Sequence, residues 1–221
     1  MVAFFMEVVW LDSDMLSLEN ISQAYAGKTI FTAQTHNFAK GVTVITGPSG
    51  AGKTTLLRIC ASVEKPKTGR VLWKGEPMRK NLRGFRSGLG YAPQRIDFPE
   101  DISGMDFLLH IAALKKLRRA DALAQATTLM ERLGLGRDAD GRIATYSGGM
   151  RRRLGLAQAC LGKPGLLIFD EPTAELDPQT SQHIHELIFE LAQNAVILMT
   201  THLMEGLAGR EMSKVHMSPA T

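Results

Sequence analysis

Short apolar runs predict strands in the N-terminal part of the chain. Residues 16–25 and 29–38 mix β-branched, aromatic and polar residues on either side of an Ala-Gly pair, which is typical of a two-stranded hairpin. Residues 42–46 form an apolar, β-branched run that leads into glycine-rich sequence, as expected of a buried parallel strand. Residues 66–75 predict a turn followed by an edge strand, and a helical pattern occupies residues 53–62.

Apolar residues recur at helical spacing in the middle of the chain. Ser103 and Asp106 have the spacing of a capping box at the start of one helix. A second helix is predicted at residues 121–133, with Gly134 and Gly136 ending it. The expected buried faces are Phe107, Ile111, Leu114 and Leu117 in the first helix, and Leu123, Ala126, Met130 and Leu133 in the second.

Strand and helix patterns alternate again in the C-terminal part. Residues 166–169 have the profile of a central strand, and residues 196–201 predict another. Between them, Asp177 and Pro178 are suited to be the N-cap and first residue of a helix. Alternating strands and helices predict an α/β fold with a mostly parallel sheet. The purely helical block at about 98–159 is expected to be a subdomain inserted into that sheet.

Length and composition limit the classes of protein that this sequence can encode. The 221 residues, 44% hydrophobic and 22% charged, suit one globular domain or one domain with an insertion, and they exclude wholesale disorder. The formal net charge of +4 is too small to indicate a nucleic-acid partner, and we expect none. Cys60 and Cys160 lie among apolar helical residues without metal-ligand spacing, so we expect buried free thiols.

The sequence predicts no membrane span, because it contains no stretch of about 18 uninterrupted apolar residues. The best candidate, residues 2–11, is interrupted by Glu7 and lacks the basic region and cleavage site of a secretory signal. We interpret residues 1–14 as an uncertain leader, with Met6 and Met15 as alternative starts. Any membrane segment that serves this protein is therefore expected in a separate chain.

Residues 47–55, GPSGAGKTT, fit the pattern GxxxxGK[ST] between a predicted strand and a predicted helix. Glycines let the backbone N–H groups of such a loop surround phosphate oxygens, and the helix N-terminus adds partial positive charge. Lys53 is placed to meet the β- and γ-phosphates, and Thr54 to offer its hydroxyl to Mg²⁺. The residues expected to bind nucleotide here are Gly47, Pro48, Ser49, Gly50, Ala51, Gly52, Lys53, Thr54 and Thr55.

Two acidic residues follow the predicted central strand. Asp170 is suited to hold Mg²⁺ through water, as the strand-end acid of nucleotide hydrolases does. Glu171 is suited to orient or deprotonate an attacking water molecule. A phosphate loop with strand-end acids still leaves kinases, GTPases and helicases open.

Six motifs in the order of one family narrow this choice, because together they resemble the nucleotide-binding subunits of ATP-binding-cassette (ABC) transporters. They are residues 47–55, similar to the Walker A loop; 91–94, YAPQ, to the Q-loop; 146–150, YSGGM, to the signature sequence LSGGQ; 166–171 to the Walker B strand; 171–177, EPTAELD, to the D-loop; and 200–202, TTH, to the switch histidine. The resemblance covers residues 15–221. It implies a P-loop NTPase core with a mostly parallel sheet, a small antiparallel β subdomain and an inserted α-helical subdomain.

The resemblance also implies that two such domains pair head to tail as a homodimer or heterodimer. Each ATP would then lie between the loop at 47–55 of one chain and Ser147, Gly148 and Gly149 of the other, where close backbone approach and a helix N-terminus suit the γ-phosphate. Asp177 is implied to cross the dimer interface.

Further roles follow from the resemblance. Tyr25 falls where the family places the aromatic residue that stacks on adenine. Thr54, Gln94 and Asp170 are implied to hold Mg²⁺, and Gln94 to contact the lytic water. Glu171 is implied to be the general base and His202 the group that keeps γ-phosphate and water in line.

The sequence departs from the family pattern at three positions. Tyr146 replaces the signature Leu, Met150 replaces its Gln, and Glu175 stands where the D-loop usually has Gly or Asn. We expect the first two to tune function and the third to affect interface packing. The three arginines at 151–153 are interpreted as a solvated helical face.

The predicted function is that of an ATP-hydrolysing subunit that powers a separate transmembrane permease. Residues 96–115 resemble the version found in bacterial export-type transporters, so export is expected. The implied location is cytoplasmic, peripheral on the inner face of the cell membrane through the permease. Two alternatives remain: a soluble ABC ATPase acting as an ATP-gated clamp or assembly factor, and a P-loop small-molecule kinase.

Overall fold

The computed structural model describes residues 15–219, so the predicted leader at 1–14 lies outside the described residues. Within that range the strands form an antiparallel sheet in the order β2-β1-β4-β5 and a parallel sheet in the order β6-β7-β8-β3-β9. The strands are β1 (Leu16–Tyr25), β2 (Lys28–Phe38), β3 (Gly41–Thr46), β4 (Thr68–Trp73), β5 (Glu76–Pro77), β6 (Leu89–Ala92), β7 (Leu166–Asp170), β8 (Val196–Thr200) and β9 (Ser213–His216). The predicted α/β fold with a mostly parallel sheet is confirmed.

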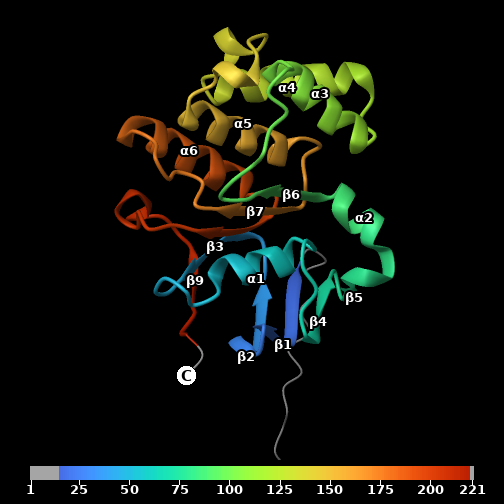
Figure 1. Ribbon diagram of the computed structural model, residues 1–221, viewed down its shortest axis with the longest axis vertical. Helices are drawn as coiled ribbons and strands as arrows, with labels where there is room; N and C mark the ends of the chain where they lie inside the picture. Colours follow the sequence, from blue (N-terminus) through green and yellow to red (C-terminus); the bar gives the residue numbers. More distant parts are fainter. Residues whose placement is uncertain (1–14, 220–221) are drawn as a thin grey trace, which may run out of the picture.

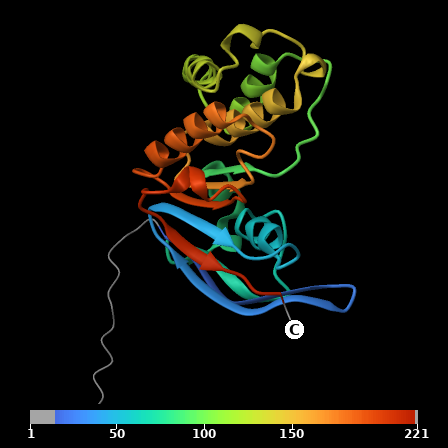
Figure 2. The ribbon, with the colours of Figure 1, turned by 90° about the vertical axis from the view of Figure 1, so that its left-hand side faces the viewer.

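The helices lie in layers on both sides of the parallel sheet. Helices α5 and α6 cover one face, with α3 and α4 farther out, whereas α1 lies on the other face, against the antiparallel sheet (Figures 1 and 2). The helices are α1 (Lys53–Cys60), α2 (Leu82–Ser87), α3 (Gly104–Leu114), α4 (Arg119–Arg132), α5 (Gly148–Cys160) and α6 (Pro178–Leu191). Short 3₁₀ helices are η1 (Met78–Asn81), η2 (Gly136–Asp138), η3 (Ile143–Thr145) and η4 (Glu205–Leu207).

Strand β7 shows why the parallel sheet needs cover on both faces. Successive side chains of a strand point to opposite faces. Leu167 and Phe169 therefore pack in the cluster formed with α5 and α6, while Leu166 and Ile168 pack in the cluster formed with α1 and the antiparallel sheet. All four are at most 1% exposed, and burial of each such side chain contributes roughly 1.5–3 kcal/mol.

The buried faces of the two middle helices agree with the prediction in part. The predicted Phe107, Ile111 and Leu117 are partly buried against the core, whereas Leu114 is 80% exposed. The fully buried residues of α3 are Gly104, Leu108 and Ala112. A Cβ atom at Gly104 would lie 2.3 Å from the hydroxyl oxygen of Tyr146, so the absence of a side chain allows this close packing. The spacing of large apolar residues does not indicate such contacts by small residues.

In α4 the predicted Ala126 and Met130 are buried, as is Leu133 directly after the helix, whereas the predicted Leu123 is 51% exposed and Ala122 is buried instead. The prediction of an edge strand at residues 66–75 is also wrong. Strand β4 pairs with β1 on one side and, through Leu72 and Trp73, with the two-residue strand β5 on the other.

The predicted helix ends are mostly confirmed. The Ser103 hydroxyl accepts a hydrogen bond from the Asp106 backbone N–H at 3.0 Å, although the Asp106 carboxylate accepts from that hydroxyl instead of returning to the Ser103 backbone. Asp177 caps α6 by accepting from the Thr180 N–H at 2.9 Å. Gly134, with φ of +65°, follows α4, whereas Gly136 begins η2 and does not end the preceding helix.

Both cysteine side chains are buried, as predicted, and burial raises the pKa of each thiol to about 12. Across residues 15–219, none of the helices combines the length and apolar character needed to cross a membrane.

Candidate functional site

The predicted site residues gather where four parallel strands end. The loop at 47–52 follows β3, Gln94 follows β6, Asp170 ends β7 and His202 follows β8. Because these strands are parallel, their carboxyl ends meet at one edge of the sheet, where open α/β sheets bind ligands. A cavity of about 370 Å³ lies there. It is lined by Ile30, Ser49, Gly50, Gly52, Lys53, Thr54, Thr55, Gln94, Asp170, Glu171 and His202.

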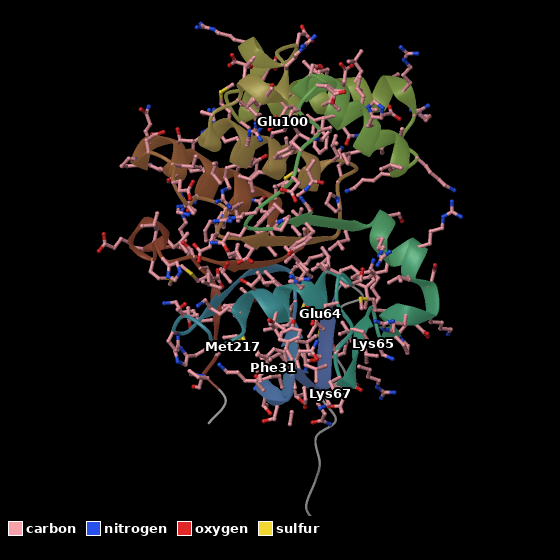
Figure 3. All side chains as sticks on the ribbon, viewed as in Figure 1. Phe31, Glu64, Lys65, Lys67, Glu100 and Met217 are labelled. Carbon is pink, nitrogen blue, oxygen red and sulfur yellow. The ribbon has the colours of Figure 1, made fainter. Side chains whose placement is uncertain are left out.

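The path of the loop depends on two glycines. At Gly52, φ is +89°, and a Cβ atom would lie 2.6 Å from Ile30 Cγ2 and 3.0 Å from the ring of Phe31. At Gly47, φ is +138°, and a Cβ atom would lie 2.2 Å from the carbonyl oxygen of Met217. Phe31 and Met217 both lie in the lower part of the molecule in Figure 3. Residues with side chains would therefore displace the loop from this position.

Positive charge faces the cavity from the loop and from helix α1. The Lys53 ammonium donates hydrogen bonds to the carbonyl oxygens of Gly47 and Pro48, at 2.9 and 3.0 Å. Helix α1 begins at Lys53, and no side chain in the described chain caps its N-terminus. Its first N–H groups and the ammonium together suit an anionic group such as a phosphate.

Asp170 has one carboxylate oxygen engaged and one without a partner. Thr200 donates to Asp170 Oδ1 at 2.6 Å, whereas the buried Oδ2 has no hydrogen-bond partner among residues 15–219. Thr54 and Gln94 line the same cavity, so three oxygen-bearing side chains are available there. Oxygen donors are the ligands that Mg²⁺ prefers, with water and phosphate completing its shell. These residues therefore fit a magnesium ion held mainly by nucleotide and water.

Glu171 contacts His202 through both of its carboxylate oxygens. The His202 backbone N–H donates to Oε2 at 3.3 Å, and His202 Nε2 lies 3.2 Å from Oε1. Glu171 is 8% exposed and adopts φ of +55°, and its own N–H donates to the Thr200 hydroxyl at 2.9 Å. A left-handed conformation is uncommon for a residue with a side chain and is found preferentially at functional sites.

Ser147, Gly148 and Gly149 do not line this cavity. Ser147 caps α5 by accepting from the Met150 N–H at 3.2 Å, and the two glycines begin the helix. Gly148 lines a second cavity, of about 350 Å³, which Gln94 and Asp170 also line. Within one chain, these three residues are therefore separate from the phosphate-loop cavity.

The remaining predicted nucleotide contacts lie around the first cavity. Ala51 is fully buried, and Gly47 and Pro48 supply the acceptors of Lys53. Tyr25 is 44% exposed at the end of β1, and its pKa is raised by burial and by its hydrogen bond to Glu64, with Thr55 acting in the opposite direction. The Tyr25 hydroxyl donates a hydrogen bond to Glu64.

Two supporting residues were missed by the sequence analysis. Glu64, labelled in Figure 3, accepts hydrogen bonds from Tyr25 and from Gln23, the latter at 2.6 Å, and lies 3.5 Å from Arg58. Thr200 links Asp170 to the Glu171 backbone. A strand alignment that placed Thr200 beside Asp170 would have identified it, because the two are register partners in adjacent parallel strands.

The departures from the family motifs have local explanations in two cases. The Tyr146 hydroxyl donates to the carbonyl oxygen of Asp138 at 2.6 Å, in the space left by Gly104. Glu175 has φ of +65°, in the conformation that glycine or asparagine adopts readily. Met150, in the first turn of α5, packs half-buried against the core.

Solved structures resemble the whole fold. The ATP-binding subunit of an ABC transporter superposes with a TM-score of 0.84 at 23% identity, covering 94% of this chain and 88% of that chain. A dimeric bacterial ABC transporter cassette superposes with a TM-score of 0.82 at 21% identity, covering 92% of this chain and 94% of that chain. At these identities the likeness supports the fold.

Proteins found by sequence comparison share a higher sequence identity with this chain than these solved structures do. The Nod factor export ATP-binding protein I of Paraburkholderia xenovorans is 35% identical over 192 residues, which is 86% of this chain and 63% of the relative. The linearmycin resistance ATP-binding protein of Bacillus subtilis is 33% identical over 193 residues, 86% of this chain and 62% of the relative. The chain thus spans less than two thirds of the length of these relatives. The family described as ABC transporter matches residues 34–174, and this chain belongs to that family.

Proposed function

We propose that this chain binds and hydrolyses ATP with Mg²⁺ as the ATPase subunit of an ABC transporter, and that it powers a separate transmembrane permease in export. The observation that carries the proposal is the single cavity that combines the phosphate loop and Lys53 with Asp170, Glu171 and His202. Relatives named for Nod factor export and linearmycin resistance support export as the direction.

Each side chain in the cavity has a chemical task in this proposal. Lys53 and the loop N–H groups bind the β- and γ-phosphates. Thr54, Gln94 and Asp170 hold Mg²⁺, which offsets phosphate charge when bound. Glu171 accepts a proton from the attacking water as general base, and His202 orients the γ-phosphate and that water. Tyr25 stacks on the adenine, with Glu64 holding its hydroxyl.

The active unit in this proposal is a head-to-tail homodimer or heterodimer. Ser147, Gly148 and Gly149 lie outside the phosphate-loop cavity of their own chain, which supports their use by the phosphate loop of a second chain. Residues 15–221 then act as one ABC ATPase domain, in which the helical subdomain at about 98–159 carries these three residues toward the partner.

The proposed contact with the permease lies between α2 and the end of α3. A cavity of about 870 Å³ there is lined by Leu82 and Ile111, the 80% exposed Leu114, and the exposed cations Arg83 and Lys116. Exposed apolar surface with a polar rim is typical of protein interaction sites. Docking at this face would hold the chain in the cytoplasm, at the inner surface of the cell membrane.

Phosphate release from ATP by the purified chain tests the enzymatic part of this proposal. We expect hydrolysis that requires Mg²⁺ and is abolished by Lys53→Ala, whereas Lys80→Ala, which changes an exposed lysine paired with Glu76, leaves it intact. Hydrolysis without Mg²⁺, or equal activity in both variants, would contradict it.

Co-expression with the multi-spanning membrane protein encoded beside this chain tests the permease part. We expect the chain to sediment with membranes and Leu114→Asp to release it without loss of ATP hydrolysis. A chain that stays in the soluble fraction whatever membrane protein is present would contradict the permease assignment.

A further inference from the structure

Helix α5 holds the segment that follows β6 through side chains on one side of the helix. Arg152 Nη1 donates a hydrogen bond to the carbonyl oxygen of Gln94 at 2.8 Å. Six residues further along α5, Gln158 Nε2 donates to the carbonyl oxygen of Tyr91 at 2.5 Å. The two bonds attach the chain to α5 at Tyr91, near the end of strand β6, and at Gln94, which lines the phosphate-loop cavity.

Between these two side chains, Gly155 of α5 packs closely against Ile96 in the segment that follows β6. Gly155 lies halfway between Arg152 and Gln158, and a Cβ atom there would lie 2.6 Å from Ile96 Cδ1. Residues three apart are neighbours on a helix surface, so Arg152, Gly155 and Gln158 form a row that winds gradually around α5. In Figure 1 the chain from β6 to α3 rises past α5, as these contacts require.

The segment connects two parts of the proposed ATP site. Gln94 lines both the phosphate-loop cavity and the second cavity, and Gly148 at the start of α5 lines the second. The Gln94 side chain is exposed on a loop, so its position depends on what holds its backbone. Helix α5 is anchored by buried residues, Leu154, Leu156 and Ala157 among them.

We propose that Arg152 and Gln158 are positioning residues that fix the main chain around Gln94 to helix α5 and so set where the Gln94 side chain enters the phosphate-loop cavity. This inference rests on the proposed ATPase function. Arg152 holds the Gln94 main chain while leaving its side-chain amide available for Mg²⁺ and water.

The neighbouring arginines make different contacts and provide matched controls. Arg151 Nη2 lies 2.9 Å from Oε1 of the exposed Glu100, which is on the same connection between β6 and α3 and is labelled in Figure 3. Arg153 donates to the carbonyl oxygens of Leu133 and Gly134 at the end of α4. Arg151→Ala therefore removes a positive charge from the neighbouring position and leaves the hydrogen bond to the Gln94 backbone intact.

Hydrogen exchange and kinetics together test the inference. In nucleotide-free protein, Arg152→Ala is expected to speed amide exchange in a peptide covering residues 91–97, and Arg151→Ala is not. Arg152→Ala is expected to lower kcat by roughly tenfold, because small displacements of a catalytic group are costly. KM for ATP should stay within about twofold, since Arg152 does not line the phosphate-loop cavity. The Mg²⁺ concentration at half-maximal rate should rise.

A double-mutant comparison separates action through Gln94 from a general structural effect. In a Gln94→Ala background the carbonyl bond to Arg152 remains, but the side chain that it positions is absent. Arg152→Ala should then lower kcat no further. An equal loss in both backgrounds, or unchanged exchange in residues 91–97, would overturn the inference. If Arg152→Ala speeds amide exchange in residues 91–97 but the wild-type chain hydrolyses no ATP, the proposed function is refuted and the attachment of Gln94 to α5 still stands.

Discussion

His202 contacts both carboxylate oxygens of Glu171, through its backbone N–H at 3.3 Å and through Nε2 at 3.2 Å. The two residues follow adjacent parallel strands, β7 and β8, so the sheet itself brings them together. Glu171 is nearly buried, whereas the His202 side chain is 72% exposed at the edge of the cavity. One residue thus limits the orientation of the carboxylate and can also reach a ligand in the cavity.

Replacement of Glu171 by glutamine should separate ATP binding from hydrolysis. Glutamine keeps the size of the side chain but cannot accept the proton of the attacking water, so we expect turnover to fall by about 10² to 10⁴-fold. ATP binding should persist, and a closed dimer should accumulate with ATP. Phosphate release and size-exclusion chromatography with ATP measure the two effects, with Glu186→Gln on the exposed side of α6 as control. Hydrolysis at the wild-type rate would exclude Glu171 as the general base.

Tyr146 and Gly104 should be coupled in stability. Tyr146→Phe removes the hydrogen bond to the Asp138 carbonyl oxygen and should cost about 1 kcal/mol. Gly104→Ala places a methyl group 2.3 Å from the Tyr146 hydroxyl oxygen and should cost about 1–3 kcal/mol. In the double variant the hydroxyl is gone, so the combined loss should be smaller than the sum. Urea unfolding of the four proteins gives the coupling free energy. Strict additivity would mean that the two positions do not share this space.

His185 should make the folded state less stable as the pH falls. The ring is 1% exposed between α6 and η4, and its pKa is lowered by burial and then by the charge of Arg210. The folded protein therefore favours the neutral ring, whereas the unfolded chain takes up a proton near pH 6.5. The stabilisation is complete above that pH and is lost below it, by at most about 1.4 kcal/mol per pH unit.

Urea unfolding at pH 7.5 and 5.5 measures this contribution of His185. The loss of stability between the two pH values should be smaller in His185→Gln than in the wild type. His36, whose pKa burial also lowers, contributes with the same sign in both proteins and cancels in the comparison. An equal loss in wild type and His185→Gln would contradict the prediction.

The phosphate-loop side of the site was predictable because its residues are contiguous or end parallel strands. The glycine spacing in residues 47–55 predicts the conformation of the phosphate loop. Asp170 and His202 follow apolar runs that are typical of central strands. The contact of Arg152 with Gln94 was not predictable in this way. Its acceptor is a backbone carbonyl oxygen 58 residues away. Every residue has such an oxygen, so the type of residue does not show which one accepts the bond.

The interpretation of residues 151–153 as a solvated face was wrong, in part for the same reason, because Arg152 and Arg153 donate to backbone carbonyl oxygens, whereas Arg151 donates to the Glu100 carboxylate. All three arginines are half-buried, and each guanidinium bonds a specific oxygen. Leu114 on α3 was wrongly predicted to be buried because periodicity identifies large apolar residues, whereas the close packing of this helix involves Gly104 and Ala112. The sequence pattern was therefore reliable for the existence and order of elements and weaker for which side of a helix is covered.

Mixing two inactive variants should restore activity if the sites form head to tail. Lys53→Ala disables the phosphate loop, and Gly148→Asp places a negative charge where the γ-phosphate of the partner would lie. A Cβ atom at Gly148 meets only Glu175 Oε2, at 3.9 Å, among the described residues, so the fold should tolerate the change. A mixed dimer then has one site with both defects and one intact site.

Random pairing of equal amounts would make about half of the dimers mixed, with about a quarter of wild-type activity if the sites act independently. Phosphate release from the mixture, compared with each variant alone, measures the recovery. The matched control mixes Lys53→Ala with a Lys53→Ala/Gly148→Asp chain, which leaves no intact site in any pairing. If each chain instead used its own Ser147-Gly148-Gly149 turn, every site in the mixture would carry a defect. The absence of recovery would therefore argue against the head-to-tail dimer, because Gly148 and Lys53 would then act within the same chain.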